Sequence, residues 1–79
     1  MADISNANAI MSTIITINGE KKRIDKQNVS LNTLFESLSI KKEGRIAEVN
    51  GKLYKGREFD SVRLQSGDNV EIIQFIGGG

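Results

Sequence analysis

The sequence contains no cysteine, no histidine and no proline. The absence of cysteine excludes disulfides, a thiolate nucleophile and cysteine-ligated metal sites, and it suits a reducing cytoplasm. The absence of histidine removes the one side chain that normally titrates near neutral pH and serves most often in acid–base catalysis. We therefore expect a protein that is not itself an enzyme and that binds no cofactor.

The chain is also short and nearly neutral. Its 79 residues suffice for one domain with one modest core. Its 11 basic and 10 acidic residues leave a net charge of +1, and the two signs interleave, so we expect no nucleic-acid partner. No apolar run is long enough to span a bilayer, and residues 1–12 lack the pattern of a secretory signal. We expect a cytoplasmic protein with no membrane partner and with residues 1–12 as a disordered leader.

Two strands joined by a tight turn are predicted after this leader. Residues 13–17 are mostly β-branched, which is typical of a strand. Asn18-Gly19 follows, and both residues accept the positive φ of a type I′ hairpin turn. Residues 20–25 return as a strand with many charged side chains, which suits an edge strand.

A helix is predicted next. Ser30 is a favourable N-cap, and the apolar residues after it recur at the spacing of one helix face. They are Leu31, Leu34, Phe35 and Leu38. We expect Lys41 and Lys42 near the C-terminal end of this helix, where its dipole favours cations, and Gly44 as its terminator.

The second half of the chain reads as short strands. Residues 45–49 form a strand, Asn50-Gly51 a turn, and Leu53-Tyr54 a short return. Residues 55–61 are predicted to be irregular, with Phe59 reaching into the core. Val70 begins the final strand, which continues to residue 76.

This order predicts an α+β domain of two layers over residues 13–76. The least charged strands, 13–17 and 70–76, should be central, adjacent and parallel, because the helix between them supplies the necessary crossover. A mixed sheet of four to five strands with one main helix packed across it is the β-grasp, or ubiquitin-like, arrangement.

The final strand leads into Ile76 and then into Gly77, Gly78 and Gly79. Glycine has no Cβ, so such a tail can pass through a channel too narrow for other residues. It would present one chemical group, the α-carboxylate of Gly79, to the active site of another protein. The alternative is a frayed terminus or a cloning remnant.

Alternation along the final strand raises a second possibility. If Val70, Ile72 and Gln74 face the helix, then Ile73 and Phe75 are exposed beside the tail. Two exposed apolar side chains there would form a docking patch for a partner protein. The alternative is that a bulge, or the end of the strand, turns them into the core.

Several short motifs occur together in one order. They are Asn18-Gly19-Glu20, a leucine-rich helix, Ala47-Glu48-Val49-Asn50, Gly67-Asp68, Val70-Glu71-Ile72-Ile73 and the three final glycines. In this order and spacing, residues 13–79 resemble the ThiS family of small sulfur carriers of thiamin biosynthesis.

The resemblance implies a mechanism and a set of partners. A ThiF-like adenylating enzyme would consume ATP to activate the Gly79 carboxylate. A persulfide sulfur donor would then convert the adenylate into a thiocarboxylate. A ThiG-like thiazole synthase would take the sulfur into the thiazole ring.

Two alternatives remain open from the sequence. The chain could carry sulfur for another pathway, as the small subunit of molybdopterin synthase and the carriers of cysteine or methionine synthesis do. It could instead be a ubiquitin-like modifier that is joined through Gly79 to lysines of other proteins. These readings share the tail and the activating enzyme, and they differ in the final acceptor.

Overall fold

The computed structural model describes residues 12–75, so the expected leader (apart from Ser12) and the expected glycine tail lie outside the described residues. The elements run in the order β1 (Thr13–Ile17), β2 (Glu20–Ile24), α2 (Leu31–Ser37), β3 (Arg45–Val49), β4 (Lys52–Tyr54), η1 (Gly56–Ser61) and β5 (Asn69–Gln74). Within residues 12–75 no helix has the length and apolarity needed to cross a membrane.

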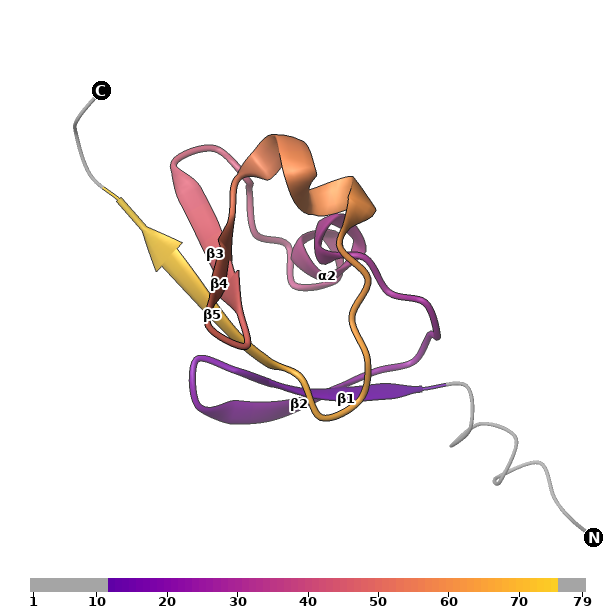
Figure 1. The fold of residues 1–79 in the computed structure, drawn as a ribbon. Helices are drawn as coiled ribbons and strands as arrows, with labels where there is room; N and C mark the ends of the chain where they lie inside the picture. The colour runs from indigo at the N-terminus through magenta and orange to yellow at the C-terminus, as the bar shows by residue number, and fades with distance from the viewer. Residues whose placement is uncertain (1–11, 76–79) are drawn as a thin grey trace, which may run out of the picture.

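The strands form one mixed sheet in the order β2-β1-β5-β3-β4. β1 and β5 pair in parallel, and the other neighbouring strands pair antiparallel. Figure 1 shows α2 and the 3₁₀ helix η1 together on one side of the sheet, opposite its open face. The predicted β-grasp architecture is therefore confirmed, with β1 and β5 adjacent and parallel and with the charged strand β2 at an edge.

The core lies between the sheet and α2. β1 contributes Ile15 and Ile17, and β5 contributes Val70, all of them buried. Of the predicted helical stripe, three residues are buried (Leu31, Leu34 and Phe35), and Leu38 packs partly buried against them. Phe59 is fully buried, as predicted, and its ring centroid lies 4.8 Å from that of Phe35.

The N-terminal end of α2 is as predicted, but its C-terminal end is not. The Ser30 side chain accepts a hydrogen bond from the Thr33 amide, 3.0 Å away, as an N-cap should. The helix stops at Ser37, and Ser39 follows with a positive φ of 58°. The Ser39 amide donates to the Glu36 carbonyl, and the Ile40 amide donates to the Phe35 carbonyl. This pattern is a Schellman motif with serine in the place that glycine usually takes.

Two expectations about the helix end are therefore wrong. Lys41 and Lys42 lie four and five residues beyond the helix end at Ser37, and the last turn contains no basic residue. Gly44 does not terminate the helix; its positive φ of 74° belongs to the turn that precedes β3.

The expectation of irregular structure at residues 55–61 is also wrong, because η1 occupies residues 56–61. The Glu58 carboxylate accepts a hydrogen bond from the Lys55 amide at 2.7 Å and so caps the first turn. This short helix carries Phe59 into the core.

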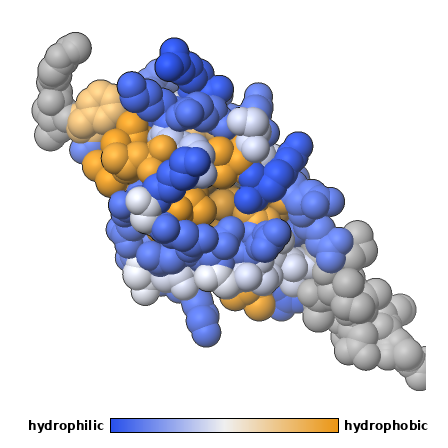
Figure 2. All heavy atoms as spheres, in the orientation of Figure 1, coloured by the Kyte–Doolittle hydropathy of each residue, from blue (hydrophilic) through white to orange (hydrophobic). Residues whose placement is uncertain are grey.

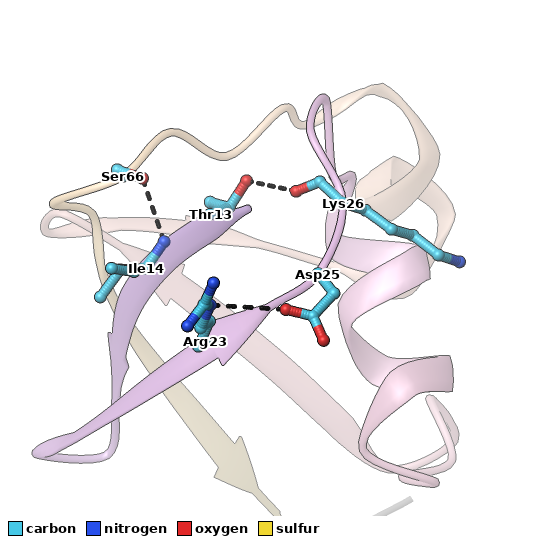
Figure 3. Close-up of polar contacts among 6 residues, drawn as sticks. All are labelled: Thr13, Ile14, Arg23, Asp25, Lys26 and Ser66. Carbon is cyan, nitrogen blue, oxygen red and sulfur yellow. Dashed lines mark hydrogen bonds and ion pairs between the residues drawn. The ribbon is translucent and has the colours of Figure 1, made fainter. Parts of the chain in front are cut away.

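The first strand is fixed at its start by polar contacts to two loops (Figure 3). The Thr13 hydroxyl donates to the Lys26 carbonyl at 2.7 Å, beyond the end of β2. The Ile14 amide donates to the Ser66 hydroxyl at 3.0 Å, in the loop before β5. Arg23 and Asp25 form an ion pair of 3.4 Å nearby. The segment after β2 and the loop before β5 are thereby held to the start of β1.

Both predicted Asn-Gly turns are present, and each asparagine has a second role. Asn18 and Asn50 have φ values of 49° and 52°, and the glycine after each also has a positive φ. The Asn18 Oδ1 atom accepts a hydrogen bond from the Ile72 amide at 2.8 Å. The Asn50 Oδ1 atom accepts from the Asn69 amide at 2.9 Å. The two turns therefore bind β5 from both of its sides.

We predict that Asn18→Gly lowers the free energy of unfolding by about 1 kcal/mol, because it keeps the turn but removes the acceptor for the Ile72 amide. Asn18→Asp keeps an acceptor oxygen and should cost less. Chemical denaturation measures both values, and amide exchange at Ile72 should be faster in Asn18→Gly than in Asn18→Asp. Equal exchange in the two variants would show that the side-chain hydrogen bond is not important.

Candidate functional site

The candidate site is the end of β5 and the face of the sheet beside it. Val70 is fully buried and Ile72 partly buried on the side of α2. Ile73 is 39% exposed and Phe75 is 55% exposed on the opposite side. The pairing of β3 with β5 is regular over the whole of β3, so no bulge turns these two side chains inward. Their predicted exposure is confirmed, and their role in docking stays a prediction.

The strand pairing continues to the last described residue. The Phe75 amide donates to the Gly44 carbonyl at 3.0 Å, one residue beyond the end of β5. The pairing of this central strand with the segment before β3 therefore extends through Phe75. Gly77, Gly78 and Gly79 lie outside the described residues, so their predicted entry into a partner's active site stays a prediction.

Ile73 and Phe75 belong to a larger apolar surface on the open face of the sheet. Ile46 lies directly across from Ile73 on β3 and is half-buried. Leu53, 56% exposed, lies on β4 opposite Glu48, diagonal to Ile46. We call Ile46, Leu53, Ile73 and Phe75 the outer apolar patch. Figure 2 shows hydrophobic side chains gathered beside the end of β5.

Two carboxylates border the outer apolar patch. Glu48 and Glu71 are direct partners in the pairing of β3 with β5, and both are half-buried. Like charges directly opposite one another destabilise a sheet. A cationic side chain of a partner protein would relieve this repulsion. The surface therefore suits a partner that offers apolar side chains together with a lysine or arginine.

Sequence reasoning missed Ile46 and Leu53 as members of this surface. Alternation in residues 45–49 places Ile46 opposite in direction to buried Ala47, so this signal was present in the sequence. The proximity of Leu53 depends on the pairing register of β3 with β4, which the local pattern does not contain.

A groove on the other face of the sheet lies between the first hairpin, the end of α2 and β5, and has a volume of about 560 Å³. Its apolar residues are Ile17, Leu38, Ile40 and Ile72, and its rim carries Glu20, Lys22 and Arg45. Its lining contains no nucleophilic thiol and no imidazole. Among residues 12–75, no three side chains of His, Cys, Asp or Glu are grouped to hold a metal ion. Glu20, Lys22 and Arg45 are the ionisable side chains in the lining of this groove.

Residues 9–79, nearly the whole chain, match the ThiS family. The chain belongs to the ThiS family. A crystal structure of the thiamine biosynthesis protein ThiS from Geobacter metallireducens superposes with a TM-score of 0.75 at 29% sequence identity. The match covers 85% of this chain and 100% of that one. No curated protein matches the chain. Membership of this family supports a sulfur-carrier role.

We predict that Ile73→Ala weakens binding to a ThiF-like adenylating enzyme about tenfold, because it removes apolar contact area from the centre of the outer apolar patch. Ile14→Ala is the matched control, since Ile14 is 45% exposed on the same face but at the start of β1. Titration calorimetry with the two variants measures the difference.

Both variants should unfold within about 1 kcal/mol of the parent protein, because neither side chain is in the core. Equal weakening by Ile73→Ala and Ile14→Ala, or no weakening by either, would contradict a docking role for the outer apolar patch.

Proposed function

We propose that this protein is a sulfur carrier for thiamin biosynthesis and that the α-carboxylate of Gly79 is the group that carries the sulfur. The match to the ThiS family, which extends through residue 79, supports this proposal most directly. The ThiS structure from Geobacter metallireducens, named as a thiamine biosynthesis protein, supports the choice of pathway.

The first step is activation of a poor acyl donor. In a ThiF-like enzyme, a carboxylate oxygen of Gly79 attacks the α-phosphorus of ATP, and pyrophosphate leaves. The product is a mixed anhydride with AMP, whose acyl carbon is open to nucleophilic attack. The activation divides one difficult substitution into two easier steps, as covalent catalysis does. ATP is consumed by the partner and is not a cofactor of this chain.

Sulfur enters in the second step. The terminal sulfur of a persulfide attacks the acyl carbon, and AMP leaves. A thiol then cleaves the resulting acyl disulfide, which releases a disulfide and leaves the thiocarboxylate on Gly79. Its ionised, polarisable sulfur acts as a nucleophile when a ThiG-like synthase builds the thiazole ring.

The protein acts in this scheme as a cosubstrate rather than as an enzyme. The sequence has neither cysteine nor histidine, so the partners supply the reactive groups. Gly77 and Gly78 let the carboxylate enter a narrow site, and the outer apolar patch provides the surface that holds the partner. We assign the protein to the cytoplasm, where ATP and these partners would be available.

Strand-like hydrogen bonding would offset the cost of ordering the tail. Fixing each glycine costs of the order of 1–2 kcal/mol of backbone entropy. Residue 76 follows directly on the paired residue Phe75, so a partner can continue the same extended conformation by strand addition.

We predict that incubation with cell extract, ATP and a sulfur source shifts the intact mass by the exchange of one oxygen for one sulfur. Deletion of Gly79 should abolish the shift, because the next carboxylate is one residue too short to reach the activating site. Intact-mass spectrometry measures both. The matched control is an added serine after Gly79, which keeps every native residue but moves the carboxylate.

Each other outcome contradicts the proposal in a distinct way. ATP-dependent conjugates with other proteins and no sulfur exchange would indicate a ubiquitin-like modifier. Sulfur exchange that feeds a molybdopterin synthase large subunit instead of thiazole synthase would establish the carrier and refute the pathway.

A further inference from the structure

Within residues 12–75, β2 lies at the edge of the sheet and has β1 as its one neighbouring strand. The Thr16 amide donates to the Asp68 carbonyl, and the Gly67 amide donates to the Ile14 carbonyl. The backbone groups of Ile14 and Thr16 therefore point away from β2. Because these residues pair with Arg23 and Lys21, the backbone groups of Arg23 and Lys21 point away from β1 as well. They form a short ladder of donors and acceptors at the open edge of the described sheet.

A channel lined by both apolar and charged side chains runs beside this edge. The groove of about 560 Å³ described above adjoins a second hollow of about 310 Å³ between β2 and α2. The two share Lys22 and Leu38 in their linings. Buried Ile24 lies at the bottom of the second hollow. A strand added along β2 would direct every second side chain into this channel.

The charge at this edge is predominantly positive. Lys21, Lys22, Arg23 and Lys26 outnumber Glu20 and Asp25. Two ion pairs, of 3.8 Å for Lys22 with Glu20 and 3.4 Å for Arg23 with Asp25, are largely exposed and therefore weak. Carboxylates of a partner can replace them.

The same charge argues against pairing with a second copy of the chain. Two β2 strands side by side would bring Lys21 and Arg23 of both copies together, and like charges across a strand pair are destabilising. An acidic strand would instead gain from these cations. The charge on β2 thus disfavours pairing with a second copy of the chain and favours a partner strand of opposite charge.

We propose that the edge of β2 binds an extended acidic segment of a partner protein, which adds to the sheet as a further strand. Alternate apolar side chains of that segment enter the channel over Leu38 and Ile24. The intervening carboxylates lie over Lys21 and Arg23 on the opposite face. Backbone hydrogen bonds to Lys21 and Arg23 provide affinity, and the alternation provides specificity.

This site is independent of the proposed function. The outer apolar patch involves β3, β4 and β5, whereas this edge is on the far side of β1. Deletion of Gly79 should therefore leave binding at β2 unchanged.

A synthetic peptide in which valine and glutamate alternate, long enough to span the five residues of β2, tests the proposal. When it is added to the full chain, amide exchange followed by NMR should slow at Lys21 and Arg23. The Lys22 amide, which faces β1, should change little. A peptide of the same composition with all valines before all glutamates, and one with lysine in place of glutamate, should not protect these amides.

Two variants of Arg23 separate the contribution of its charge to peptide binding from the contribution of its backbone amide. Arg23→Gln removes a cation but keeps the amide, and it should weaken binding about threefold. Arg23→Pro also removes the outward amide and should weaken binding at least about tenfold. Should Arg23→Pro not fold, the pair Lys21→Glu with Arg23→Glu keeps every amide and should abolish binding by charge reversal.

Three results would overturn the proposal. The first is the absence of peptide-dependent protection at Lys21 and Arg23, or protection at Ile73 and Phe75 instead. The second is protection without peptide that rises with protein concentration, which would show self-pairing. The third is protection of the Lys21 and Arg23 amides without peptide that does not depend on protein concentration. If deletion of residues 1–11 removed this protection, those residues would be the segment that covers the β2 edge.

Discussion

The fold depends on the attachment of β5 between β1 and β3. Only Thr16 and Ile17 of β1 pair in parallel with β5, at Asn69 and Val70. The Asn18 side chain extends this short contact by accepting from the Ile72 amide, and the Asn50 side chain accepts from the Asn69 amide on the β3 side of β5. The turns that reverse β1 and β3 therefore also hold the central strand. With β5 held in this position, Val70 and Ile72 face α2 and contribute to the core. Ile73 and Phe75 are left on the open face of the sheet.

Much of the fold could be predicted because its signals are local. The β-branched residues 13–17, the two Asn-Gly pairs and the apolar spacing from Leu31 each specify their own element. The end of α2 could not be predicted in this way. It rests on Ser39 in a left-handed conformation, a place where glycine is the usual signal. The helix η1 was also missed, since its first turn depends on the Glu58 carboxylate and its position on the burial of Phe59.

The candidate site also combines features that the pattern of one strand predicts with features that depend on the pairing and packing of several elements. The exposure of Ile73 and Phe75 follows from the two-residue period of one strand, and the structure agrees with it. The addition of Ile46 and Leu53 to that surface requires the register between three strands. The channel beside β2 requires the packing of α2 against the sheet. The local pattern gives the direction of a side chain on its own strand, as it does for Ile46, but it does not give the register that brings residues of different strands together.

We propose that the folded domain presents the Gly79 carboxylate to partner enzymes, which carry out the chemistry. Mass spectrometry of the C-terminal peptide, released from protein isolated from its native cells, tests this most directly. The account predicts a fraction of the peptide with one oxygen of the Gly79 carboxylate replaced by sulfur, and no modification elsewhere. A sulfur-free C-terminus under thiamin starvation, or sulfur attached to another residue, would contradict it.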